Sequence, residues 1–230
     1  MKNHLKVGTV ILIATIFLAG CNQKETGSSD AAAKAKSSKL AKQKKYDEGI
    51  QAKVQNGTYS FAKTQDWIHP YHMKTSAGIF SLAEPEITFS TDSTGKKLTE
   101  QGFQVSFVYK NTTKKPQDGI KVLQSLMKVQ ELKILGTKSS ASRINFYRVT
   151  APYNGMDQNV HDSQVREIAN NGKMTQPGET INQIVGVIEP VKKPRSHFMN
   201  PMQARVTFYA DPKSKVELKT TKMNIVLRFD

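Results

Sequence analysis

Apolar and polar residues alternate along several short segments of the chain, which is the pattern of half-buried β-strands. In the segment 102–109, the apolar side chains that share one face are Phe103, Val105, Phe107 and Tyr109. A strand presents every second residue to the same face, so this segment predicts a strand with one buried face. Further segments of this kind are 204–209, 223–229, 86–91, 143–149 and 180–189, with weaker signals at 59–63 and 79–82. Short strands separated by Gly, Pro and Asn predict a mainly β fold, an antiparallel sandwich.

Two segments with helical spacing interrupt the strands. Asp118 can cap a helix that runs to about Lys128, because apolar residues recur there every three or four positions. A strand over Val129–Leu135 is expected to follow it. Asp157 can cap a second helix, and Gly172, after an asparagine, is the residue type that ends helices. We expect both helices to be insertions in the sandwich.

The turns between the expected strands contain residues suited to them. Gln176–Glu179 places Pro at the second position and Gly at the third, as a type II turn requires. The run V-Y-K-N-T-T-K-K-P, Val108–Pro116, ends a strand with turn formers. With this run and the later P-G-E-T, the chain resembles an uncharacterised immunoglobulin-like domain of Gram-positive lipoproteins over about Ile79–Phe229. The resemblance implies an extracellular, membrane-anchored immunoglobulin-like sandwich with no established ligand, and it carries over no functional residue.

The first 21 residues have the pattern of a secretory leader. A charged start precedes the apolar run Val7–Phe17, and small residues follow in Leu18-Ala19-Gly20-Cys21. This last motif resembles the lipobox of a bacterial lipoprotein precursor. The resemblance implies a diacylglyceryl thioether on Cys21 and signal cleavage between Gly20 and Cys21. The mature protein is then expected on the outer face of the cytoplasmic membrane, held by its lipid and facing the extracellular side.

An uncleaved membrane anchor is the alternative to this leader. The apolar run to Gly20 is 14 residues long, whereas a spanning helix needs about 20. We therefore expect a signal peptide at 1–20, a tether at 21–57 that begins with the lipidated cysteine, and one β-sandwich domain at 58–230. The few apolar residues of the Lys-, Ala- and Ser-rich tether are Leu40, Tyr46, Ile50 and Val54. Because a solitary polar helix is marginal in water, the tether is expected to be flexible or partly helical.

Composition and charge narrow the expected partners. The 230 residues include 34 Lys and Arg against 19 Asp and Glu, a net charge of +15. A positive surface attracts polyanions, which at the expected location are membrane headgroups and anionic wall polymers. No nucleic acid partner is expected, because the chain has no nucleic-acid-binding motif. Cys21 is the only cysteine, so no internal disulfide can form and stability must come from an apolar core.

The densest cluster of aromatic and polar residues is Asp66–Met73, which holds the only tryptophan. Trp67 and Tyr71 are candidates for a surface on which a sugar or peptide stacks. His69 and His72 have a spacing that could supply two metal ligands, but the proline between them disfavours a shared helical face. These four residues form the candidate ligand-binding set, and neither a metal nor a cofactor is expected. In the alternative interpretation, the aromatic rings plug one end of the sandwich and the histidines are solvated.

No catalytic motif stands out elsewhere. Lipidation consumes the only thiol, and neither a Gly-x-Ser-x-Gly elbow nor a Gly-rich phosphate loop occurs. We therefore expect no enzyme but a binding or scaffolding protein, whose partner is a cell-envelope protein or an anionic wall polymer. One alternative is an electrostatic binder of wall or membrane polymers, through basic clusters at 114–115, 192–195 and 213–219. The other is a cell-envelope hydrolase with paired carboxylates, drawn from Glu84, Glu86, Asp92 and Glu189.

Overall fold

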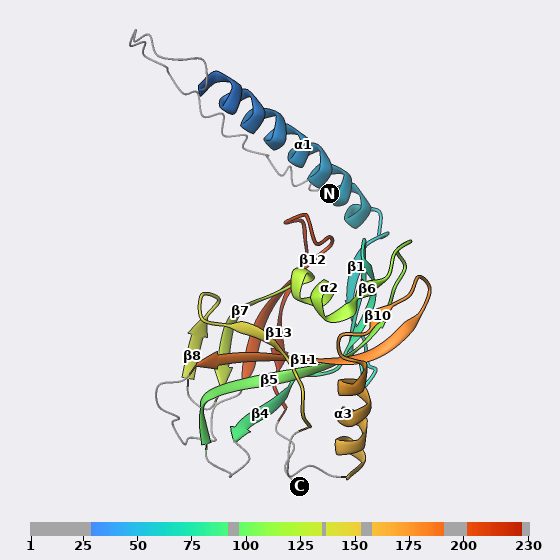
Figure 1. The fold of residues 1–230 in the computed structure, drawn as a ribbon, viewed down its shortest axis with the longest axis vertical. Helices are drawn as coiled ribbons and strands as arrows, with labels where there is room; N and C mark the ends of the chain where they lie inside the picture. Colours follow the sequence, from blue (N-terminus) through green and yellow to red (C-terminus); the bar gives the residue numbers. More distant parts are fainter. Residues whose placement is uncertain (1–28, 92–96, 135–136, 153–157, 191–201, 227–230) are drawn as a thin grey trace, which may run out of the picture. The chain divides into compact units, whose positions relative to one another are not determined.

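The computed structural model describes residues 29–91, 97–134, 137–152, 158–190 and 202–226. Over these ranges the protein is mainly β and has three helices; Figure 1 shows how these elements are arranged. The helices are α1 (Ser29–Gln55), α2 (Gly119–Leu126) and α3 (Gln158–Asn170). The strands are β1 (Ser60–Lys63), β2 (Tyr71–Thr75), β3 (Gly78–Leu82), β4 (Glu86–Thr91), β5 (Lys97–Lys110), β6 (Gln117–Asp118), β7 (Met127–Ile134), β8 (Thr137–Ser140), β9 (Asn145–Arg148), β10 (Met174–Thr175), β11 (Thr180–Pro190), β12 (Gln203–Tyr209) and β13 (Glu217–Asn224).

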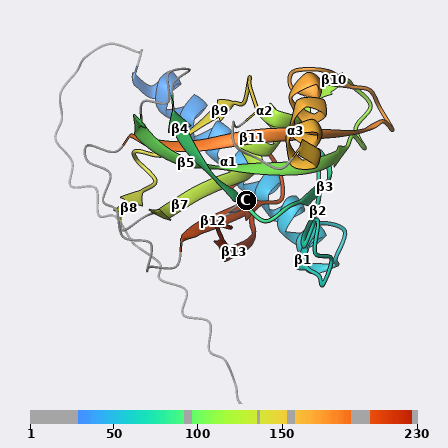
Figure 2. The ribbon, with the colours of Figure 1, turned by 90° about the horizontal axis from the view of Figure 1, so that it is seen from below.

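Within the described ranges, the named strands pair in an antiparallel sense and form two main sheets. The first sheet has the order β1-β2-β3-β5-β11-β9, and β4 pairs with another part of β5. The second sheet has the order β13-β12-β7-β8, and β6 and β10 form a separate short ladder. Both views show β5 and β11 side by side (Figures 1 and 2), and with 14 and 11 residues they are the longest of the described strands. The expected antiparallel, mainly β class is confirmed.

The strand predicted from Phe103–Tyr109 is confirmed as the inner part of β5. Phe103, Val105 and Tyr109 have no exposed surface, and Phe107 is 1% exposed. The Tyr109 ring stacks on Phe80 of β3, with ring centroids 4.7 Å apart. Burying these side chains is worth about 2 kcal/mol each by transfer from water, so this face anchors the first sheet in the core.

The two main sheets contribute to one hydrophobic core. Phe80 and Leu82 of the first sheet belong to the same cluster of buried residues as Leu132 and Phe208 of the second. The contact is direct between Phe61 of β1 and Phe208 of β12, whose rings stack with centroids 5.0 Å apart. The core therefore lies between the inner faces of the two sheets.

Helix α2 enters this core at its junction with the second sheet. Asp118 caps it, as predicted, by accepting hydrogen bonds from the N–H groups of Ile120 and Lys121 at 3.1 and 3.2 Å. The helix ends at Leu126, earlier than the expected Lys128, because the backbone at Met127 is already extended and starts β7. The buried side chains that α2 contributes to the core are Ile120, Val122, Leu123 and Leu126.

The chain divides into two compact units, residues 1–41 and 42–230, and helix α1 crosses the division. In the described part of the first unit, the side chains at 32–41 are exposed. In the second unit, Ile50 is only 5% exposed and Asp47 accepts a hydrogen bond from Ser214 Oγ at 2.6 Å. The folded unit therefore begins before the expected boundary at residue 58, and the end of the segment expected as a flexible or partly helical tether is a helix packed on this unit. No helix among the described residues is long and apolar enough to cross a membrane.

Other boundaries differ from the expectation for identifiable reasons. The last strand among the described residues is β13, Glu217–Asn224, which starts before the predicted segment 223–229 and overlaps it at 223–224; residues 227–230 lie outside the described ranges. Because β13 is an edge strand, it carries exposed polar side chains and lacks a strong alternating signal. Strand β2 begins inside the aromatic and polar cluster Asp66–Met73, where no strand was predicted, and β8 was not predicted either. Helix α3 ends as predicted before Gly172, which has φ of 83°; the expected cap, Asp157, is outside the described residues.

Candidate functional site

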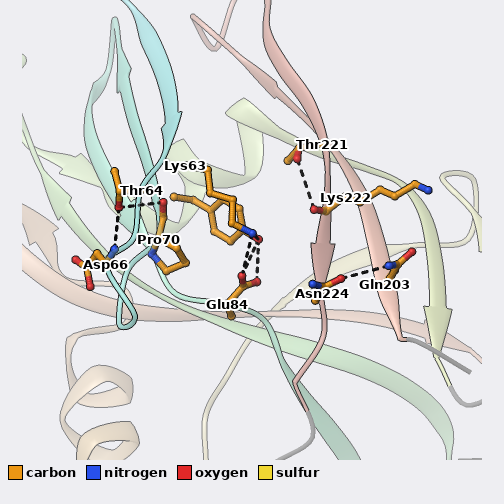
Figure 3. Close-up of polar contacts among 10 residues, drawn as sticks. Lys63, Thr64, Asp66, Pro70, Glu84, Gln203, Thr221, Lys222 and Asn224 are labelled. Carbon is orange, nitrogen blue, oxygen red and sulfur yellow. Dashed lines mark hydrogen bonds and ion pairs between the residues drawn. The ribbon is translucent and has the colours of Figure 1, made fainter. Parts of the chain in front are cut away.

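Trp67, the first of the predicted ligand contacts, lies in the loop between β1 and β2. Asp66 holds this loop by accepting hydrogen bonds from the N–H groups of Ile68 and His69, at 2.9 and 3.2 Å. These two donors stabilise the charged carboxylate and lower the pKa of Asp66. Thr64 Oγ1 in turn accepts from the Asp66 N–H at 3.3 Å (Figure 3). The loop thus presents an indole that is 87% exposed.

Tyr71 does not share this surface. It begins β2, has no exposed surface, and donates its hydroxyl hydrogen to the Glu84 carboxylate, with O···O distances of 2.8 and 3.0 Å. Lys63 lies 3.4 Å from the same carboxylate (Figure 3). Burial, and then the bond to Glu84, raise the pKa of Tyr71. A two-ring stacking surface of Trp67 and Tyr71 is therefore wrong, because Tyr71 belongs to the core and only Trp67 is exposed.

The two histidines are held in different ways. His69 is half-buried in the loop, and its loss of hydration lowers its pKa. His72 lies on β2 opposite Ser81 of β3, and its Nδ1 is 2.9 Å from Ser81 Oγ. No group of three or more metal-ligating side chains comes together among the residues that the structure describes.

The His72–Ser81 pair contains two of the groups that a serine hydrolase uses, so its surroundings decide what it can do. β2 has a partner strand on each side, β1 and β3, and β3 lies between β2 and β5. The backbone N–H groups of such strands are taken by the ladders, whereas an oxyanion hole needs donors aimed at a substrate. Neither residue lines either of the two cavities described below. The arrangement is that of a cross-strand hydrogen bond.

A cavity of the folded unit, which we call the cleft, has a volume of about 760 Å³. The end of α1 forms one wall, and the start of α2 with the β12–β13 turn forms another. Apolar side chains contribute much of its lining, among them Ile50, Val122 and Met174. Such a mixture of apolar surface with a few polar groups is typical of ligand sites.

Asp211 supports the wall of the cleft but offers little charge to a ligand. It is 4% exposed and accepts hydrogen bonds from Tyr46 Oη at 2.8 Å, from Ser76 Oγ, and from the Lys213 N–H at 2.7 Å. Burial, and then the bond to Asp211, raise the pKa of Tyr46 to about 12, so its hydroxyl stays protonated and donates. Through these three hydrogen bonds, the Asp211 carboxylate holds α1, the β2–β3 turn and the β12–β13 turn together.

Asp118, the other carboxylate of the cleft, is similarly engaged. Besides capping α2, it lies 3.6 Å from the guanidinium of Arg148 and 3.9 Å from Lys121 Nζ. Only 10% of its side chain is exposed, against 77% of Lys121. The lysine is therefore the more accessible charge at this end of the cleft.

Two further lysines complete the charged lining. Lys53 Nζ is 3.3 Å from Tyr59 Oη and 5.3 Å from the centre of that ring. Lys213 comes from the β12–β13 turn, where its backbone is fixed by Asp211 and by Gln43, whose side chain donates to the Lys213 carbonyl at 3.1 Å. Among the described residues, neither lysine forms an ion pair with a carboxylate. The cleft thus combines three cationic side chains with two carboxylates that are already bonded.

Some of the residues that line this cleft were noted in the sequence, but the sequence did not predict that they lie together. Asp118 was predicted as a helix cap, and Tyr46 and Ile50 were noted in the tether. Thr113 and Lys213 line the cleft at the edge of two of the predicted basic clusters, while the third cluster, 192–195, lies outside the described residues. Ser76 and Asp211 gave no signal, because their role depends on contacts between residues 135 or more positions apart. Comparison of the chain with protein-family models, curated proteins and solved structures finds no match.

Proposed function

We propose that this protein is a lipid-anchored extracellular lipoprotein whose β-rich domain binds an anionic component of the cell envelope without catalysis. The anchor would be the lipid on Cys21, exposed by cleavage after Gly20; both residues lie outside the described ranges, and the lipobox pattern supports the assignment. The location would be the outer face of the cytoplasmic membrane. The ligand would occupy the cleft between α1, α2 and the β12–β13 turn.

An immunoglobulin-like sandwich is the fold that we propose for this domain. Two antiparallel sheets with a common core, and short helices inserted between strands, support it. The 14-residue strand β5, which pairs with β3, β4 and β11, is an elaboration on a minimal sandwich.

The observation that carries the functional proposal is the balance of charge in the cleft. The cleft is lined by Lys53, Lys121 and Lys213. Its two carboxylates, Asp118 and Asp211, are nearly buried, and their oxygens accept hydrogen bonds from groups of the protein itself. A ligand with phosphate or carboxylate groups would gain from the lysines with little repulsion. Its less polar parts would contact Ile50, Val122 and Met174. A diffuse attraction between the whole basic surface and a polymer is the second candidate, favoured by the net charge of +13 that remains after cleavage behind Gly20.

Binding of poly(glycerol phosphate), a soluble anionic polymer, tests the proposal. Calorimetric titration would compare the wild-type protein with a cleft variant that carries Lys53→Gln, Lys121→Gln and Lys213→Gln. The control removes three exposed charges from β7 and β13, through Lys128→Gln, Lys133→Gln and Lys222→Gln. We expect the cleft variant to lose about tenfold in affinity, or about 1.4 kcal/mol, and the control to lose much less.

Other results of this titration would favour a different binding site or a different mechanism. Equal losses in both variants would replace the cleft by diffuse charge, and binding that survives in both at high salt would exclude an electrostatic mechanism. If Trp67→Ala weakens binding and the cleft variant does not, the exposed loop is the contact. Absence of binding in the wild type would contradict an anionic polymer as ligand.

A further inference from the structure

Helix α3 covers the outer face of the first sheet through polar side chains. Residues paired across neighbouring strands share a face, and Gln104 of β5 is paired with both Glu86 of β4 and Gly186 of β11. This face is opposite to the one that carries Phe103 and Val105 into the core. Figure 2 shows α3 lying beside β11 and β5.

Two hydrogen bonds join the middle of α3 to this face. Gln164 Nε2 donates to Gln104 Oε1 at 3.2 Å, and Ser106 Oγ donates to Glu167 Oε2 at 2.8 Å. Of the α3 residues whose exposure the structure describes, Gln164 alone is buried, while Val165 is 43% exposed. A helix usually docks by an apolar stripe. Here the contact in the middle of α3 is made by an amide and a carboxyl group.

The end of α3 is fastened separately. Asn170 Nδ2 donates to the Asn182 carbonyl at 3.0 Å, and Asn171 bonds the Val149 carbonyl at 3.0 Å and the Ile184 N–H at 3.1 Å. These groups do not titrate. The contacts that hold this end of α3 therefore do not depend on the protonation of a side chain.

Among the described residues, Glu86 of β4 and Arg166 of α3 act on the charge of the Glu167 carboxyl group. Lys173 and Glu179 line, with Arg166 and Glu167, a neighbouring cavity of about 450 Å³. Burial is the main cause that raises the pKa of Glu167 to about 7, and Glu86 adds to it; the Ser106 hydrogen bond and Arg166 oppose it.

We propose that Glu167 is a proton-controlled latch, which holds α3 on the sheet when its carboxyl group is protonated and loosens the helix when it ionises. In a detached helix the carboxyl would be hydrated, with an ordinary pKa near 4.5. A group whose pKa is higher in the docked state stabilises docking fully below the lower value. That contribution is lost as pH rises through about 7, so α3 is weakest on the sheet at alkaline pH.

Hydrogen exchange of the full chain at several pH values tests the latch. Protection factors, which already divide out the intrinsic pH dependence of exchange, would be compared for the amides of α3 and α2. From the two pKa values, the α3 protection should fall by about 30-fold between pH 5.5 and 8. The α2 amides, which have no titrating contact of this kind, should keep their protection.

Three variants separate the latch from a merely structural role. In Glu167→Gln the amide oxygen can still accept from Ser106, so α3 should stay protected at both pH values. Gln164→Ala removes a polar contact that does not titrate, and should lower protection equally at both. Ser106→Ala removes the bond that favours the charged carboxylate, and should move the midpoint to higher pH. A wild-type α3 whose protection is independent of pH, or a pH response that survives in Glu167→Gln, would overturn the proposal.

Discussion

At the scale of single residues, Asp118 links three parts of the fold through one carboxylate. It caps α2 through Ile120 and Lys121, and it pairs with Arg148 of β9. We expect Asp118→Ala to lower the free energy of unfolding by about 1–2 kcal/mol, because two helix N–H groups lose their acceptor. Urea unfolding followed by circular dichroism measures this loss.

The matched variant is Asp118→Asn, which keeps an oxygen that can cap the helix but removes the charge beside Arg148. It should cost less than Asp118→Ala, since an ion pair with a half-exposed arginine contributes at most about 1 kcal/mol. Equal destabilisation by both substitutions would show that the ion pair, rather than the cap, stabilises this corner.

Local chemistry explains which residues were predictable. The Asp118 cap and the turn at Gly178, with φ of 83° and a 3.0 Å bond between the Glu179 N–H and the Gln176 carbonyl, depend on neighbours in sequence. Tyr71 was misplaced because its burial depends on packing in the core and on Glu84, 13 positions away. Asp211 had no local signal at all, since its partners Tyr46 and Ser76 are distant in the chain.

At the scale of elements, the docked end of α1 is the part most open to test. Ile50 is 5% exposed, whereas Leu40 on the same helix is 71% exposed. We expect Ile50→Ala to destabilise this contact by about 2 kcal/mol, because it removes buried methyl groups. Tryptic cleavage at Lys53 should then become faster, and amide exchange over 43–55 should increase.

Leu40→Ala is the control for this prediction, because it shortens an aliphatic side chain of α1 in water and should change neither rate. Tyr46→Phe tests the polar part of the same contact: it leaves the buried Asp211 with one donor fewer, at a cost of about 1 kcal/mol. If Ile50→Ala and Leu40→Ala behave alike, α1 does not depend on this packing.

Strands could be predicted from the sequence where one face of the strand is buried and the other is exposed. The alternation in β5 and β12 reflects an apolar inner face, and both strands were found within a few residues of their ends. The α1 helix was underestimated because its sequence is polar on nearly every side, and its few packing contacts are made by residues near its end. Edge strand β13 was displaced for the same reason, since an exposed edge needs no apolar pattern.

At the scale of the whole molecule, the basic charge and the expected lipid on Cys21 would both hold the protein at the membrane surface. After cleavage behind Gly20 the chain keeps 32 Lys and Arg against 19 Asp and Glu, and this net charge of +13 would attract it to anionic headgroups and wall polymers. Salt would weaken this attraction over about 10 Å at 0.1 M. An attraction of that kind cannot by itself retain a protein through a high-salt wash. Acyl chains can, because their hold is hydrophobic and two or more together are stable. Retention at high salt therefore isolates the contribution of the lipid.

We expect the wild-type protein, expressed in a Gram-positive host, to incorporate labelled palmitate and to stay with the membrane fraction in high salt. Cys21→Ala should incorporate none and lose that retention. Because Cys21 is the only cysteine, maleimide labelling of the denatured wild-type chain reports directly on the unmodified fraction, which should be small. A wild-type chain that reacts fully with maleimide, or palmitate incorporation equal to that of Cys21→Ala, would contradict lipidation. In either case the uncleaved apolar leader or the basic charge would have to keep the domain at the envelope, and only an association through charge would disappear in salt.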